Sequence, residues 1–185
     1  MSSRVMSWAI FDRGITIAEQ LGHRVNLDHW RTTMEAIHTQ VMREGWSDRL
    51  GAFRQSYESD ALDASALLIP VMGFLPADHP RVVSTVQRIE DSLMVDGFVY
   101  RVHEEGAAPT HETLGEHEGA FLPCTFWLAT TYAMARRPDQ AETILNRAET
   151  CAGSLGLFAE ELDPRCGRFW GIAHSSLRTS NIFGL

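Results

Sequence analysis

The sequence contains no lysine: all sixteen of its basic residues are arginines, and they are scattered along the 185-residue chain. Clustered arginines would suggest phosphate binding, but these form no cluster. The formal net charge of −8 gives a nucleic-acid partner no general electrostatic support. We interpret the lack of lysine as the codon bias of a GC-rich genome, and we expect no nucleic-acid partner.

Cysteine is also scarce, with only Cys124, Cys151 and Cys166 present. Their odd number and lack of metal-ligand spacing fit a reducing compartment better than a disulfide framework. The N-terminus lacks the basic-then-apolar pattern of a secretory signal. The longest apolar run, residues 64–75, is too short to span a bilayer and is broken by a proline and a glycine. We therefore expect a soluble, cytoplasmic protein with no membrane partner.

Helical periodicity is what the chain has in abundance, because apolar residues recur at spacings of three and four almost throughout. We predict a short hairpin or ordered loop over 46–57, an extended stretch over 98–101, and a capping box formed by Asp139 and Glu142. The absence of a linker indicates one domain, and helices without a clear sheet indicate an all-α array of helical hairpins, a bundle or a toroid. The predicted helices cover residues 8–22, 27–45, 60–72, 80–93, 118–136 and 139–152. We expect Asn26 to cap the second helix and Pro80 to open the fourth.

Two segments of the second half carry the chemistry. Residues 115–128 read GEHEGAFLPCTFWL, and residues 156–164 read GLFAEELDP. Each places carboxylates beside aromatic and small residues in an otherwise apolar stretch. That combination suits chemistry on a polyhydroxylated substrate. In a toroid, the long loops on one rim would hold such a site.

Five segments, in order, resemble glycoside hydrolase family 15, the family of glucoamylases and bacterial trehalases. The resemblance implies an all-α (α/α)6 barrel, of which residues 1–168 would supply the later part. Residues 169–185 depart from the family pattern and form a divergent tail, which a frameshift would explain. The five segments are RVMSWAIFDR (4–13), YESDALDAS (57–65), DGFVYR (96–101), EGAFLPCTFW (118–127) and LFAEELDP (157–164).

The resemblance also implies a reaction, inverting hydrolysis of an α-glucosidic bond by two carboxyl groups. The family's general base maps onto Glu160, and Glu161 would be its neighbour in the sugar site. Arg101 matches a sugar-binding arginine, whose planar guanidinium can bind adjacent hydroxyls. Glu118 and Trp127 would line the pocket. The implied substrate is an α-glucoside or oligosaccharide, and no cofactor or metal is implied.

Each of these residues has an ordinary structural interpretation as well. Glu160 could be a solvated helix-end carboxylate, and Arg101 could pair with a nearby acid. Glu118 could be a carboxylate favoured by a helix N-terminus, and Trp127 could belong to the core. For Asp60 and Asp63 we prefer helix capping to any catalytic role.

A competing site is the His- and Glu-rich stretch 103–118, which could suggest a bound metal. Its residues do not form the His-Glu-x-x-His pattern, and glycine and proline interrupt it. We favour a solvated, weakly pH-sensitive loop. The sequence also lacks a glycine-rich phosphate loop and a Gly-x-Ser-x-Gly elbow.

The family's general acid lies in a Trp-Glu segment just upstream of the helix that matches residues 4–13, so we expect it outside this chain. Little activity is then expected from the chain alone. An incomplete barrel would also expose apolar stripes, which predicts self-association. Two alternatives remain: a non-catalytic carbohydrate-binding or helical scaffold protein, and an unrelated helical enzyme using a metal in the His- and Glu-rich loop.

Overall fold

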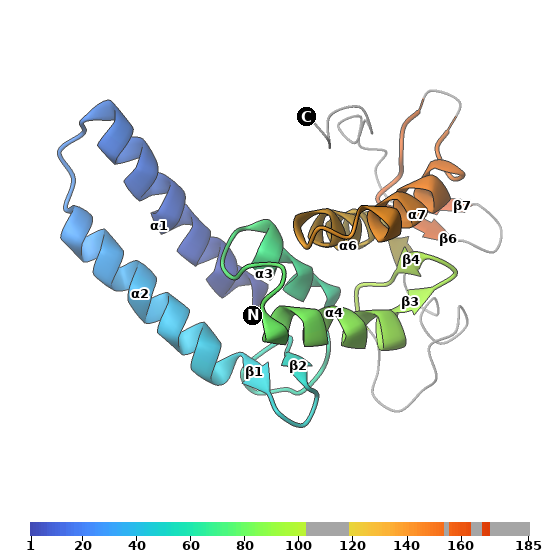
Figure 1. Ribbon diagram of the computed structural model, residues 1–185, viewed down its shortest axis with the longest axis horizontal. Helices are drawn as coiled ribbons and strands as arrows, with labels where there is room; N and C mark the ends of the chain where they lie inside the picture. Colours follow the sequence, from blue (N-terminus) through green and yellow to red (C-terminus); the bar gives the residue numbers. More distant parts are fainter. Residues whose placement is uncertain (103–118, 154–155, 164–167, 171–185) are drawn as a thin grey trace.

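The computed structural model describes residues 1–102, 119–153, 156–163 and 168–170 (Figure 1). Most of these residues are helical, and the strands are only two or three residues long. The all-α fold class predicted from the sequence is therefore confirmed. Across the described ranges, no helix is both long and apolar enough to cross a membrane.

Helices α1 (Ser2–Leu21) and α2 (Leu27–Glu44) form an antiparallel hairpin that projects from the rest of the described chain (Figure 1). Gly22 ends α1 in the left-handed conformation, with φ at 64°, which a residue with a Cβ rarely adopts. The Asn26 side chain accepts a hydrogen bond from the His29 amide at 3.1 Å. The predicted cap of the second helix is thus confirmed.

A short hairpin follows, as predicted, in which β1 (Trp46–Ser47) pairs antiparallel with β2 (Ala52–Phe53). Phe53 is completely buried, and its amide donates to the Thr85 hydroxyl at 3.1 Å. A buried backbone amide needs an acceptor, and the Thr85 hydroxyl supplies it here. This hydrogen bond fixes the hairpin against α4 (Pro80–Leu93), the helix that carries Thr85.

The helix predicted over residues 60–72 is wrong in its first four residues and in its regularity. The chain there forms a single 3₁₀ turn, η1 (Ala64–Leu67), followed by the four-residue helix α3 (Leu68–Val71). Asp63 remains extended, and its carboxylate accepts from the Ser65 amide at 2.7 Å. This confirms Asp63 as a cap. It also explains the late start, because a carboxylate that binds the backbone locally competes with helix formation.

Asp60 does not act as a cap. Its carboxylate pairs with the guanidinium of Arg49, at 2.7 Å, and with that of Arg54, at 3.3 Å. The Arg49 hydrogen bond, followed by one from Ser47, lowers the pKa of Asp60. The segment before η1 is therefore an ion-paired loop.

Helix α4 (Pro80–Leu93) begins at the predicted proline, which lacks the amide that a first helical turn leaves unpaired. The His79 side chain accepts from the Arg81 amide at 3.2 Å and caps the helix. The extended stretch predicted next belongs to a hairpin whose turn residues Asp96 and Gly97 have positive φ. Its strands are β3 (Met94–Val95) and β4 (Phe98–Val99).

Most residues of helix α6 (Leu122–Met134) are buried, and the partly exposed ones lie on one side of the helix. It contacts α7 (Pro138–Glu149), α3, η1 and β4. The predicted helix began earlier, at residue 118, but residues 120 and 121 belong to a strand. The buried residues of α6 are Leu122, Cys124, Thr125, Phe126, Leu128, Ala129, Thr131 and Tyr132.

The capping box predicted from Asp139 and Glu142 is wrong. Helix α7 begins at Pro138, one residue earlier than expected, and the residue that precedes it is Arg137. No side chain caps this end. The proline explains the start, because its fixed φ favours the first helical position over the preceding one.

The last described segments form a three-stranded antiparallel sheet in the order β5-β6-β7. Ala120 pairs with Leu162, and Phe121 pairs with Glu161. The sheet joins the amino end of α6 to the chain that follows α7. Its strands are β5 (Ala120–Phe121), β6 (Glu161–Asp163) and β7 (Arg168–Trp170).

Candidate active site

The predicted base, Glu160, immediately precedes strand β6 and is half-buried. Its backbone carbonyl accepts a hydrogen bond from the Leu122 amide at 3.0 Å, which extends the pairing of β5 with β6. Leu122 is fully buried and opens α6. The backbone that carries Glu160 is therefore tied directly to the central helix of the fold.

The Glu160 carboxylate has no hydrogen-bond or ion-pair partner among the residues that the structure describes. Many other carboxylates of this chain are engaged: Asp60 holds two arginines and Asp63 caps a helical turn. A half-buried carboxylate on a fixed backbone, with both oxygens available, is suited to accept a proton from water.

The neighbouring carboxylate, Glu161, is held by the residue that precedes strand β5. One of its oxygens, Oε2, accepts a hydrogen bond from the Gly119 amide at 3.2 Å. A Cβ built on Gly119 would lie 2.8 Å from the Leu162 carbonyl oxygen, so only glycine permits this close approach of the two backbones. Sequence reasoning missed this role of Gly119, although the residue stands in the motif that signalled the site. The predicted sugar contact of Glu161 stays a prediction, with its second oxygen available.

Arg101 follows the β3–β4 hairpin, and its guanidinium is exposed. Its carbonyl accepts from the Ala64 amide at 2.9 Å, and the adjacent Val102 forms a bridge with Asp63. The guanidinium has no acceptor among the residues that the structure describes. Arg101 is therefore a cation on an anchored backbone, and its predicted contact with sugar stays a prediction.

Strand β4 brings Arg101 toward the same end of the molecule as Glu160. The Val99 amide donates to the hydroxyl of Thr125 on α6 at 3.0 Å, in the buried core. Strand β4 also contacts β5, the strand that pairs with β6, and Figure 1 shows β4, β6 and β7 gathered at this end. Thr125 was not predicted to have a role, because a threonine inside an apolar helical stretch gives no signal in sequence.

The pKa of the Cys124 thiol is affected by burial and by two charged residues of this region. Burial raises the pKa of its thiol strongly, the carboxylate of Asp63 raises it further, and the guanidinium of Arg101 opposes both. The thiol is therefore neutral at physiological pH and acts as a small apolar residue. Its response to Asp63 and Arg101 places all three residues in one neighbourhood.

Trp127 is half-buried and packs against the core. This contact fits the structural interpretation of Trp127, and its predicted role as an apolar wall for sugar stays a prediction. Glu118 lies outside the described residues, as does the His- and Glu-rich stretch 103–118. Within the ranges that the structure does describe, no group of three or more His, Cys, Asp or Glu residues is placed to hold a metal ion.

Comparison with known proteins identifies the lineage. Residues 1–179 match the family model of glycosyl hydrolases family 15. A trehalase of Thermoplasma acidophilum is 38% identical over 169 residues, which are 91% of this chain and 28% of that protein. A trehalase of Mycobacterium tuberculosis is 40% identical over 172 residues, which are 92% of this chain and 24% of that protein.

A solved glycosidase in complex with glucose has the same fold, with a TM-score of 0.74 at 19% identity. The match covers 87% of this chain and 41% of the glycosidase. This chain thus spans about a quarter of the length of the curated relatives it matches. The chain, including the segments that carry Arg101 and Glu160, belongs to glycosyl hydrolases family 15.

Proposed function

We propose that this chain is the base-carrying part of a glycoside hydrolase that cleaves α-glucosidic bonds with inversion. The observation that carries the proposal is the Glu160 carboxylate, unpaired within the described structure and held at the start of β6 by a bond to α6. Family membership supports the proposal, because the resemblance matches Glu160 to the family's water-activating base.

In this mechanism Glu160 removes a proton from water as the water oxygen attacks the anomeric carbon. The glycosidic bond to the leaving oxygen breaks on the opposite face of the sugar. A second carboxyl group protonates that leaving oxygen, and in inverting enzymes it lies about 6.5–9.5 Å from the base. We expect the second group in the segment that precedes the α1 sequence in longer relatives. The chain alone should then show little turnover, because general acid catalysis typically contributes about 10²–10⁴-fold.

The remaining predicted residues would bind and orient the sugar. Arg101 would donate to adjacent hydroxyls through its planar fork. Glu161 would accept a hydroxyl hydrogen bond with the oxygen that Gly119 leaves available, Glu118 would line the pocket, and Trp127 would supply an apolar wall. The names of the relatives favour trehalose as the α-glucoside.

A chimeric enzyme tests the proposal. This chain is grafted in place of the aligned 172-residue segment of the Mycobacterium tuberculosis trehalase, which is 40% identical to it. We expect the chimera to release glucose from trehalose. Glu160→Gln should reduce kcat by about 10²–10⁴-fold. The matched control is Glu149→Gln, which changes an exposed carboxylate at the end of α7 and should leave kcat unchanged.

Equal activity of the Glu160→Gln and Glu149→Gln chimeras would reject Glu160 as the base. Circular dichroism shows whether each chimera is folded. If trehalose raises the melting temperature of a folded chimera that never releases glucose, the non-catalytic carbohydrate-binding function is correct instead.

A further inference from the structure

A buried hydrogen bond joins helix α6 to the strand that leads to Arg101. The Val99 amide of β4 donates to the Thr125 hydroxyl at 3.0 Å, and both residues are fully buried. The next amide of the strand, that of Tyr100, donates to the Leu93 carbonyl at 2.8 Å. Successive amides of a strand point to opposite edges. The hairpin therefore holds β4 along one edge, and Thr125 holds it along the other.

The hydroxyl of Thr125 is used differently from those of two other threonines in α6. Thr130 and Thr131 donate to the carbonyls of Phe126 and Trp127, four residues earlier in the same helix, each at 2.8 Å. Such bonds stay within the helix. Thr125 instead accepts from a separate element of the fold. A buried amide needs an acceptor, and Thr125 supplies one where an apolar side chain could not.

The same turn of α6 also holds the backbone of the candidate base. The Leu122 amide donates to the Glu160 carbonyl at 3.0 Å. Leu122 and Thr125 are three positions apart, so they are neighbours on the helix surface and lie about 4.5 Å apart along its axis. One helical turn therefore connects Glu160 to the strand that precedes Arg101.

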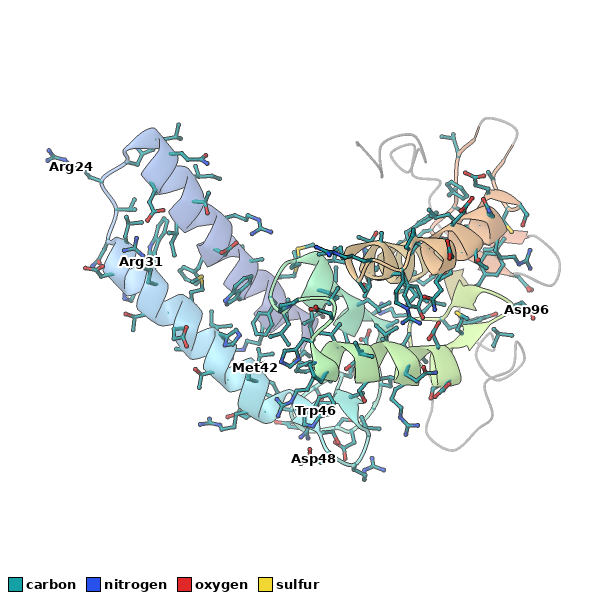
Figure 2. The ribbon with its side chains drawn as sticks, in the orientation of Figure 1. Arg24, Arg31, Met42, Trp46, Asp48 and Asp96 are labelled. Atoms are coloured by element: carbon teal, nitrogen blue, oxygen red, sulfur yellow. The ribbon has the colours of Figure 1, made fainter. Side chains whose placement is uncertain are left out.

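The other anchors of the Arg101 segment lead to other elements. The Asp96 carbonyl, at the turn of the β3–β4 hairpin, accepts from Arg147 of α7 at 2.9 Å (Figure 2). The Arg101 carbonyl accepts from the Ala64 amide of η1 at 2.9 Å. Thr125 thus ties β4 to the helical turn that holds the candidate base, which neither of these two anchors does.

We propose that Thr125 is a positioning residue for sugar binding, whose hydroxyl keeps β4 and Arg101 in a fixed place relative to Glu160. Thr125 is buried and would not touch the sugar itself. Without this acceptor the Val99 amide would either stay buried and unpaired or move to another partner, so the Arg101 backbone would shift. A displacement of about 1 Å can cost about 10²-fold in activity. The inference rests on the proposed sugar contact of Arg101.

The test uses the trehalase chimera. Thr125→Val keeps the shape of the side chain and removes the acceptor, and it should raise KM for trehalose by about 10–100-fold. The value of kcat should stay unchanged, because Glu160 keeps its bond to the Leu122 amide and the loss is one of sugar binding. Thr125→Ser keeps the hydroxyl and should restore KM. If circular dichroism shows that Thr125→Val is unfolded, Thr125→Cys replaces it, since a thiol is only a weak acceptor and should also raise KM.

The matched control is Thr85→Val. Thr85 is also a buried threonine that accepts from a backbone amide, that of Phe53, but it serves the β1–β2 hairpin. Both valine variants should lower the melting temperature, because each leaves a buried amide without its acceptor. The KM should change in Thr125→Val alone. Equal changes of KM in the two variants would overturn the proposal, because the effect would then reflect a general loss of stability.

A double-mutant cycle tests whether Thr125 acts through Arg101. Arg101→Ala should raise KM, and adding Thr125→Val should raise it no further, because both substitutions remove the same contact. Two effects that multiply would contradict the proposal. Calorimetric titration of trehalose into the Glu160→Gln chimera measures the same differences in affinity without turnover. A fully active Glu160→Gln chimera would reject the proposed base while the KM comparison still decides the role of Thr125, whereas a folded chimera that binds no trehalose would overturn both.

Discussion

Helices α6 and α1 both carry many apolar residues, but their surroundings differ. Leu122 and Leu128 of α6 are fully buried, whereas Ile10 of α1 is 69% exposed. Their neighbours differ: among the described elements α6 packs mainly against α3, α7, η1 and β4, whereas α1 packs mainly against α2 and α3. Most of the apolar surface of α6 is therefore covered by the described residues. Helix α1 carries apolar side chains that the described residues leave exposed.

The comparison is tested most strongly by truncating one leucine or isoleucine in each helix. Leu128→Ala should lower the free energy of unfolding by about 2–5 kcal/mol, because the side chain leaves a cavity in a closed core. Ile10→Ala should change it by less than about 0.5 kcal/mol. Urea denaturation of dilute protein measures both values. Similar losses for the two variants would show that α1 is buried in solution.

The second prediction concerns the β5–β6 contact that anchors Glu160 to α6. Gly119→Ala should destabilise the chain by about 1–3 kcal/mol, because the new Cβ would meet the Leu162 carbonyl oxygen at 2.8 Å. Gly153→Ala is the control, since its Cβ would meet only the Leu157 oxygen, at 3.5 Å. Thermal unfolding compares the two. A Gly119→Ala variant as stable as the control would mean that the strands are not held at this spacing.

The third prediction concerns the Asn26 cap at the start of α2, in the α1–α2 hairpin. Asn26→Ala removes the acceptor of the His29 amide and should lower stability by about 1 kcal/mol. Asn26→Ser keeps a capping oxygen and should lower it less. Hydrogen exchange locates the effect, and we expect faster exchange in α2 with α6 unchanged. Faster exchange in α6 as well would show that the hairpin and the core unfold as one unit.

The smallest expected effect is on how the free energy of unfolding depends on pH, through Tyr132 of α6. Burial and the hydrogen bond that the Tyr132 hydroxyl donates to Glu90 raise the pKa of Tyr132. Because the folded pKa lies above the unfolded value of about 10, the tyrosine's contribution is complete below that pH and is lost as the pH rises above it. Tyr132→Phe should therefore lose stability less steeply above pH 10. Identical slopes in urea titrations would contradict the link between α6 and α4.

Sequence patterns predicted the elements whose signals are local. The periodicity of α1 and α2, the Asn26 cap and the proline that opens α4 all depend on residues within one or two helical turns, and the structure confirms them. The helix predicted over 60–72 begins later than expected, because the Asp63 side chain binds the backbone at that point.

The candidate site was predicted only as a set of residue types in family order. Glu160 and Arg101 follow from the resemblance, but their anchoring does not. The Leu122–Glu160 bond and the contact between Gly119 and Leu162 join segments about forty residues apart, so no local pattern encodes them. Exposed apolar side chains were expected from an incomplete barrel, but their position on α1, at Met6, Ile10, Ile17 and Leu21, became clear only in the structure.

The central claim is that Glu160 activates water directly. The most direct test is the anomeric form of the glucose that the trehalase chimera first releases, followed by proton NMR before mutarotation. Inversion predicts one β-glucose and one α-glucose from each α,α-trehalose, with both products lost in Glu160→Gln. Release of α-glucose alone would indicate retention through a covalent intermediate and would contradict the assignment of Glu160 as a base.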